Sequence, residues 1–130
     1  MSGRIQLYLW ALGAGLIAQG AVSLLLDATD EASTRLPQRF ADADPLHASI
    51  HVAWGLVMLA LLRRGLSDVG AARLALAFGV FYSALAVAGL VIHHPLGMHL
   101  DRGENVFHLI VGPATLAVGL VGMRAATVRA

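Results

Sequence analysis

The chain contains no cysteine, which excludes disulfide bonds, thiolate metal ligands and cysteine nucleophiles. Charged residues are also scarce: they make up 13% of the 130 residues, against roughly 25% in a typical soluble domain. Lysine is absent, and nine arginines against eight acidic residues give a net charge of +1, which offers no electrostatic footprint for nucleic acid. Neither a Walker-type phosphate loop nor a Gly-x-Ser-x-Gly motif occurs. The scarcity of charge indicates that much of the chain lies in lipid.

Long apolar runs take the place of the missing charge. Hydrophobic residues make up 58% of the sequence, and the mean hydropathy is +0.73. Four runs can be drawn, at about 5–26, 46–62, 71–92 and 106–123. Their lengths fit the roughly 20 residues that a helix needs to cross a bilayer, and they do not alternate as membrane β-strands do. We predict an all-α fold, a four-helix transmembrane bundle that forms a single integral membrane domain.

The residues that flank these runs predict where the helices begin. Asp44 can cap the second helix, with Pro45 in its first turn, where a missing N–H costs nothing. Ser67 or Asp68 can cap the third helix. The run at 5–26 is longer than the apolar core of a signal peptide, which is about 7–15 residues, so we expect it to be retained as a span.

The placement of charge predicts the orientation. Six arginines fall on one side of the predicted spans, whereas the other side holds three arginines and seven of the eight acidic residues. The six are Arg4, Arg63, Arg64, Arg73, Arg124 and Arg129. The positive-inside rule then predicts that both termini lie in the cytoplasm. No span carries a charged residue at mid-depth, which argues against an ion-coupled pump or a voltage sensor.

All six histidines fall on the side opposite the predicted cytoplasmic termini: His47, His51, His93, His94, His99 and His108. On the second span, His47 and His51 are four residues apart and so share one helix face. Glu104 and His108 have the same spacing on the fourth span. If the two faces meet, these four residues form one group of potential ligands, called here the histidine cluster: His47, His51, Glu104 and His108.

The two histidine-bearing spans match at an offset of 57 residues. Gly55 follows His51 by four residues, as Gly112 follows His108. With two helices in each half, this pattern is consistent with two parallel helix-pair repeats about an axis along the membrane normal.

Four interpretations of the histidine cluster are open. Neutral imidazole and carboxylate groups suit a transition metal such as Zn, Cu, Fe or Mn. A b-type haem could instead be held between His51 and His108, with Gly55 and Gly112 making room for the flat ring. The histidines could also serve only to hydrogen-bond across helices and stabilise the bundle. Finally, they could sense protons.

Other polar residues carry weaker predictions. His93, His94 and His99 either supply further ligands, together with Met98 as a soft ligand for copper, or belong to a solvated turn. Gln19 and Tyr82 lie deep in the spans, and we expect each to hydrogen-bond to a neighbouring helix or a backbone carbonyl.

The segment Asn105-Val106-Phe107-His108-Leu109-Ile110-Val111-Gly112, together with His51-Val52-Ala53-Trp54-Gly55, resembles a bacterial family of small four-span membrane proteins of unknown function. Members of that family carry Asn-x-x-His-Leu-x-x-Gly in the last span. The resemblance covers nearly the whole chain and implies a four-span fold in the bacterial cytoplasmic membrane. It implies no activity.

The sequence therefore predicts a small multi-pass membrane protein whose histidine cluster either stabilises the bundle or binds a metal, with no enzymatic activity expected. The first alternative is a haem- or metal-dependent redox or electron-transfer protein with His51 and His108 as ligands. The second is an accessory subunit of a larger membrane complex. The lipid bilayer is the expected environment, a homo-oligomer or a larger complex could form in it, and nucleic acid is not expected as a partner.

Overall fold

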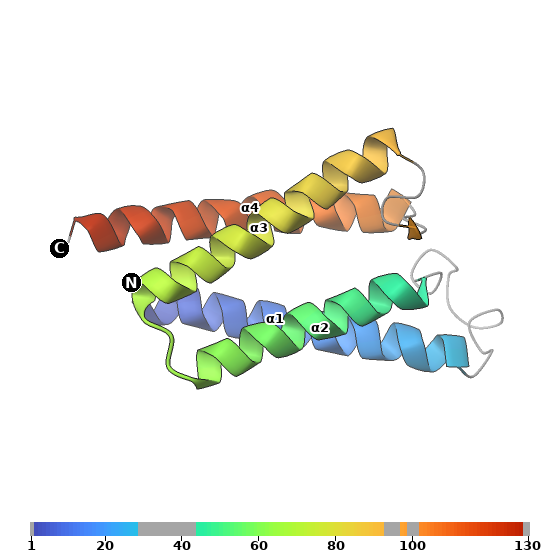
Figure 1. Cartoon of the computed structure of the whole chain (residues 1–130), viewed down its shortest axis with the longest axis horizontal. Coiled ribbons are helices and arrows are strands. Elements are labelled where there is room, and N and C mark those ends of the chain that lie inside the picture. Colours follow the sequence, from blue (N-terminus) through green and yellow to red (C-terminus); the bar gives the residue numbers. More distant parts are fainter. Residues whose placement is uncertain (1, 29–43, 93–96, 99–101, 129–130) are drawn as a thin grey trace.

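The computed structural model describes residues 2–28, 44–92, 97–98 and 102–128. These residues form four helices, α1 (Ser2–Ala28), α2 (Pro45–Arg63), α3 (Asp68–Val91) and α4 (Arg102–Thr127) (Figure 1). All four are long and apolar enough to cross a membrane, and the described part of the chain contains no strand. The prediction of an all-α, four-helix transmembrane bundle is confirmed, and the chain is a multi-pass membrane protein.

The helix ends follow the local chemistry of the flanking residues. The carboxylate of Asp44 accepts a hydrogen bond of 2.9 Å from the Leu46 N–H at the start of α2. Ser67, rather than Asp68, caps α3, because its hydroxyl accepts from the Gly70 N–H at 3.1 Å. Between these helices Gly65 takes a φ of 77°, the left-handed conformation that commonly ends a helix.

α4 begins before the apolar run from which it was predicted. The fourth apolar run was expected to begin at residue 106, whereas α4 begins at Arg102. Hydropathy marks where a helix enters hydrocarbon, and it misses a polar first turn. Glu104 lies in that first turn, where a negative charge is favoured by the positive end of the helix dipole.

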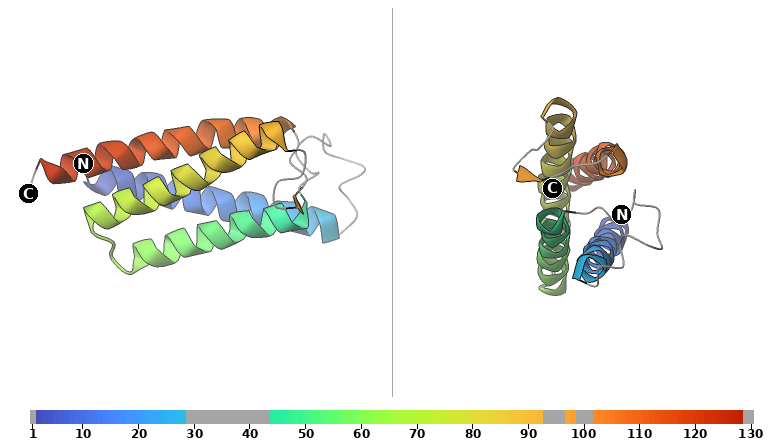
Figure 2. Two further views of the ribbon diagram at one scale, coloured as in Figure 1. Left: turned by 45° about the horizontal axis from the view of Figure 1, so that its top comes forward. Right: turned by 90° about the vertical axis from the view of Figure 1, so that its right-hand side faces the viewer.

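The four helices form two antiparallel pairs. α1 packs most extensively against α2, and α3 against α4. α1 begins and α4 ends at one end of the bundle, called here the terminal end, and the α2–α3 turn lies at that same end (Figures 1 and 2). The view along the helices shows the pairs stacked side by side, with α1 next to α4 and α2 next to α3 (Figure 2, right). α2 and α4 therefore lie diagonally across the bundle.

Within each pair, glycine lets the helix backbones approach closely. A Cβ atom on Gly55 would lie 2.6 Å from the carbonyl oxygen of Gly13, and one on Gly112 would lie 2.7 Å from the Ser83 nitrogen. Close approach at small residues is the usual way in which helices associate in lipid, where no hydrophobic effect drives them together. Gly55 therefore allows α2 to pack closely on α1, and Gly112 allows α4 to pack closely on α3.

The contacts of the two pairs correspond. Gly13 lies against Leu59, and Gly79 lies against Leu116. The two leucines are 57 residues apart, as are Gly55 and Gly112, whereas the two α1 and α3 positions are 66 residues apart. A connection that is shorter in the second half accounts for this difference. The equivalent packing supports the interpretation of two parallel helix-pair repeats.

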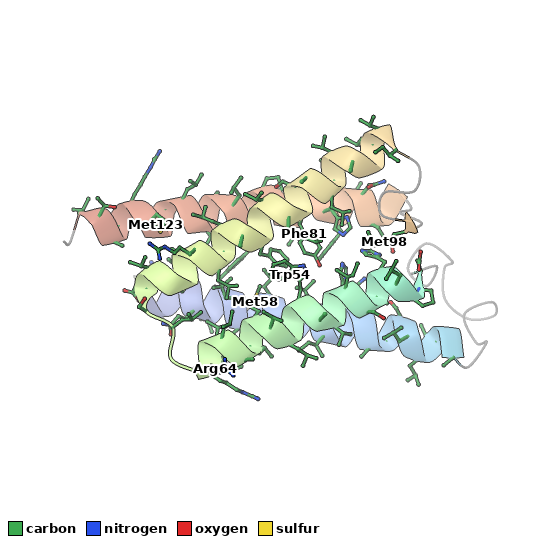
Figure 3. All side chains as sticks on the ribbon, viewed as in Figure 1. Trp54, Met58, Arg64, Phe81, Met98 and Met123 are labelled. Atoms are coloured by element: carbon green, nitrogen blue, oxygen red, sulfur yellow. The ribbon has the colours of Figure 1, made fainter. Side chains whose placement is uncertain are left out.

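The core is aromatic around the middle of the bundle. Trp54 on α2 lies against Phe78 and Phe81 on α3, with ring centroids 5.6 and 5.4 Å apart, and Figure 3 shows Trp54 and Phe81 between the pairs. Phe78 in turn stacks on Tyr82 at 4.2 Å. Large apolar side chains such as Leu7 and Leu90 remain exposed on the outside, as expected for a surface that faces hydrocarbon.

Candidate metal centre

The histidine cluster lies at the end of the bundle opposite the terminal end, in the first turns of α2 and α4. His47 and His51 are both 1% exposed and His108 is fully buried. One ring nitrogen of each of the three histidines lies within 4.8 Å of the others. The two faces predicted from the sequence therefore do meet, across the diagonal of the bundle.

His47 occupies the middle of the group. Its Nε2 atom lies 3.3 Å from the Nε2 atom of His108. Its ring centroid is 4.4 Å from that of His51 and 5.2 Å from that of His108, while the latter two are 5.9 Å apart. All three rings meet edge-on rather than stacked, so their nitrogens can point toward a common centre.

Glu104 holds the other side of the His47 ring. Its Oε1 atom lies 2.8 Å from His47 Nδ1, and this hydrogen bond joins α4 to α2. A carboxylate can only accept, so His47 Nδ1 carries the proton and its Nε2 keeps a free lone pair. A histidine held through its second nitrogen by a carboxylate is a common arrangement among metal ligands.

Gln19 on α1 does the same for His51. Its Oε1 atom accepts a hydrogen bond from His51 Nδ1, so the lone pair of His51 is also on Nε2. Gln19 otherwise lies on the exposed surface of α1, where an amide in hydrocarbon is costly unless it is hydrogen-bonded. The prediction that Gln19 bonds to a neighbouring helix is confirmed. That its partner is a cluster histidine was not predicted.

Several buried polar atoms around the cluster have no hydrogen-bond partner among the described residues. They include Nε2 of His51 and Nδ1 of His108. Asn105 Oδ1, one turn before His108 on α4, is a third. Buried polar atoms are rarely left unpaired, so His51 Nε2 has unused capacity to bind a ligand.

Aromatic rings close the cluster on its membrane side. The centroid of Tyr82 lies 5.1 Å from that of His108 and 5.7 Å from that of His51, and Phe107 lies 5.9 Å from His51. The Tyr82 hydroxyl has no partner among the described residues, so the predicted hydrogen bond from Tyr82 is not found.

The loop histidines cannot be added to this group. His93, His94 and His99 lie outside the described residues. Met98 is fully buried and lies near the cluster end of the bundle (Figure 3). The candidate site therefore consists of three histidines with Glu104 and Gln19 behind them.

Comparisons with protein-family models, with curated proteins and with solved structures gave no match. No relative therefore indicates a function, and the geometry of the site is the guide to it.

Three imidazoles with ring nitrogens this close together could form a ligand set for Zn, Cu, Fe or Ni. Three histidines that leave a fourth position open are also the ligand set of one well-known type of catalytic zinc site. In a tetrahedral site with Zn–N bonds of about 2.0–2.1 Å, ligand nitrogens lie roughly 3.3 Å apart. His47 and His108 already have this separation. A modest side-chain movement of His51 would complete the site.

A haem does not fit between His51 and His108. The ring of His47 lies against both of them, where the macrocycle would have to pass. Gly55 and Gly112 were expected to make room for the haem, and this is wrong: they face the backbones of α1 and α3. The space beside these glycines is filled by their own helix partners.

Proposed function

We propose that the protein is a membrane metal-binding protein that holds one transition-metal ion through His47, His51 and His108. The observation that carries this proposal is the convergence of three buried ring nitrogens within 4.8 Å of one another. Two of these histidines are orientated by an acceptor on Nδ1, which leaves Nε2 free to coordinate. Glu104 and Gln19 are positioning residues in this proposal rather than ligands.

The metal interpretation is favoured over a purely structural role by a buried ring nitrogen that has no hydrogen-bond partner among the described residues. A histidine that only joined helices would be expected to use its polar atoms in hydrogen bonds across the bundle. Here His51 Nε2 is buried and unpartnered among the described residues. The Nε2 atoms of His47 and His108 lie 3.3 Å apart, and without a cation His108 Nε2–H would donate to the lone pair of His47 Nε2. A cation bound by all three histidines would use the unpartnered Nε2 atom of His51 and replace the hydrogen bond between His47 and His108.

The positive-inside rule adds a location. The six arginines on the side of the termini favour a position of the histidine cluster near the outer face of the membrane. The resemblance to small four-span bacterial proteins adds the bacterial cytoplasmic membrane. The metal site would then lie on the periplasmic side of the membrane, where it could take up metal from outside the cell.

Metal titration of the purified protein in detergent tests the proposal. Zn²⁺ and Cu²⁺ are added in competition with a chelator, and binding is measured for the wild type and for His51→Ala. Loss of a ligand should weaken binding by more than about 100-fold, since loss of a residue that only positions a ligand costs 10–100-fold. Gln6→Ala is the control, because it removes a hydrogen-bonding side chain at the terminal end, away from the cluster. Equal affinity in the wild type and in His51→Ala would contradict the site.

A stability measurement separates the metal role from a structural one. Ligand binding to the folded state at 100 times Kd adds about 2.7 kcal/mol to the free energy of unfolding. Added metal should therefore stabilise the wild type and leave His51→Ala unchanged. If His51→Ala destabilises the protein and metal stabilises neither form, the histidines serve only to hold the helices together.

A further inference from the structure

A groove lies between α1 and α4 near the terminal end, away from the histidine cluster. Its volume is about 410 Å³, within the range of ligand sites. It is lined by Arg4, Ile5, Tyr8, Ala117, Val118 and Val121. The walls are almost wholly apolar, so Arg4 lines the groove with the aliphatic stem of its side chain. The groove shares no residue with the histidine cluster.

The spacing of the lining residues gives the groove its direction. Arg4 and Tyr8 are four residues apart on α1, as Ala117 and Val121 are on α4, so each pair lies on one helix face. The groove thus runs along both helices for about one turn, or roughly 6 Å. Arg4 lies at the terminal end of this turn, in the first turn of α1.

Tyr8 forms the inner end of the groove with its ring, because its hydroxyl is engaged elsewhere. The Tyr8 hydroxyl lies 2.6 Å from Oγ1 of Thr115. Thr115 gives its own proton to the carbonyl oxygen of Val111 at 2.7 Å, so Tyr8 is the donor. No polar group of Tyr8 is then left to turn toward the groove. Inside the mouth, the groove offers only an apolar lining.

We propose that this groove binds an acyl chain of an anionic phospholipid whose phosphate pairs with Arg4. The groove opens from a membrane-spanning surface, so hydrocarbon is what surrounds it. An arginine forms charge-assisted, often bidentate, hydrogen bonds with phosphate. Basic pockets between membrane helices on the cytoplasmic side are a known way of holding anionic headgroups.

Native mass spectrometry of the detergent-purified protein tests this proposal. Phosphatidylglycerol and phosphatidylcholine with the same acyl chains are the probes. The wild type should retain one phosphatidylglycerol per chain and bind it several-fold more tightly than phosphatidylcholine. Arg4→Gln should lose this preference. Arg124→Gln is the matched control: it removes an exposed arginine from the last turn of α4 that does not line the groove, and it should keep the preference.

A second variant tests the groove itself. Ala117→Phe fills it and should abolish the retained lipid, while Leu120→Phe, at an exposed position outside the groove, should not. Circular dichroism checks that both variants fold, and the Arg4→Gln result stands whether or not Ala117→Phe does. Equal retention of the two lipids by the wild type would overturn the proposal. So would unchanged preference in Arg4→Gln, or a dimer in which a second copy takes the place of the lipid.

Discussion

The Nε2 atoms of His47 and His108 lie 3.3 Å apart, although α2 and α4 sit diagonally across the bundle. This separation is about that of two nitrogens on one tetrahedral zinc ion. The two side chains bridge the centre of the bundle from opposite helix pairs. A metal held there would join the two pairs directly, close to the end where the helices leave the membrane.

Glu104 should tune the affinity of the site without being a ligand. Glu104→Ala removes the acceptor that fixes the His47 ring, so metal affinity should fall by about 10–100-fold. Glu104→Gln keeps an acceptor oxygen and should lose less. Competition titration with Zn²⁺ measures both. Asp68→Asn, which alters another first-turn acid at the far end of the bundle, is the control and should bind as the wild type does. An unchanged affinity in Glu104→Ala would remove Glu104 from the site.

Gln19 should act on His51 in the same way from α1. Gln19→Leu leaves His51 Nδ1–H without an acceptor, and metal affinity should again fall by about 10–100-fold. Gln19→Glu retains an acceptor and should keep most of the binding. Gln6→Leu is a matched control on the same helix, because Gln6 donates to the Leu66 carbonyl oxygen at the terminal end. If Gln6→Leu weakens metal binding as much as Gln19→Leu does, the effect is general destabilisation.

The two close-packed glycines should be sensitive to a single added methyl group. Gly55→Ala and Gly112→Ala place a Cβ 2.6–2.7 Å from a neighbouring backbone atom, so each should destabilise the protein by about 1–3 kcal/mol. Unfolding by SDS in mixed micelles, followed by circular dichroism, measures the change. Gly15→Ala is the control, since nothing lies within 4 Å of its Cβ position and alanine favours the helix by about 1 kcal/mol. Equal effects at Gly15 and Gly55 would contradict the packing.

The orientation can be tested because the chain has no cysteine of its own. Single cysteines are introduced at Asp30 and at Asp68, and intact cells are treated with a membrane-impermeant maleimide. The positive-inside rule predicts labelling of the first and protection of the second. Labelling at Asp68 alone would reverse the orientation, and labelling of both from the same side would refute the topology.

Much of the fold could be predicted because it depends on local properties. Hydropathy located all four helices, and the side chains of Asp44 and Ser67 cap α2 and α3 as their positions suggest. Hydropathy does not mark the start of α4, because the first turn of this helix is polar. The position and the cap of a helix depend on its own sequence, so they can be predicted without knowing how the helices pack.

The site was only partly predictable because it depends on how the helices face one another. Spacing placed His47 and His51 on one face of a helix, and it could not say what lay opposite. It also misassigned the role of Gly55, because a glycine that admits a cofactor and one that admits a backbone look the same in sequence. Gln19 carried a signal, a lone amide in an apolar span, whose partner only the packing of α1 on α2 could identify. Whether the chain forms a homo-oligomer or joins a larger complex stays a prediction.

Elemental analysis tests the central claim most directly. The protein is purified from cells grown with added Zn²⁺ and Cu²⁺, and metal per chain is measured beside a triple variant in which His47, His51 and His108 are alanine. The proposal predicts close to one metal ion per chain in the wild type and almost none in the triple variant. Equal metal content in the two proteins, at any level, would contradict it.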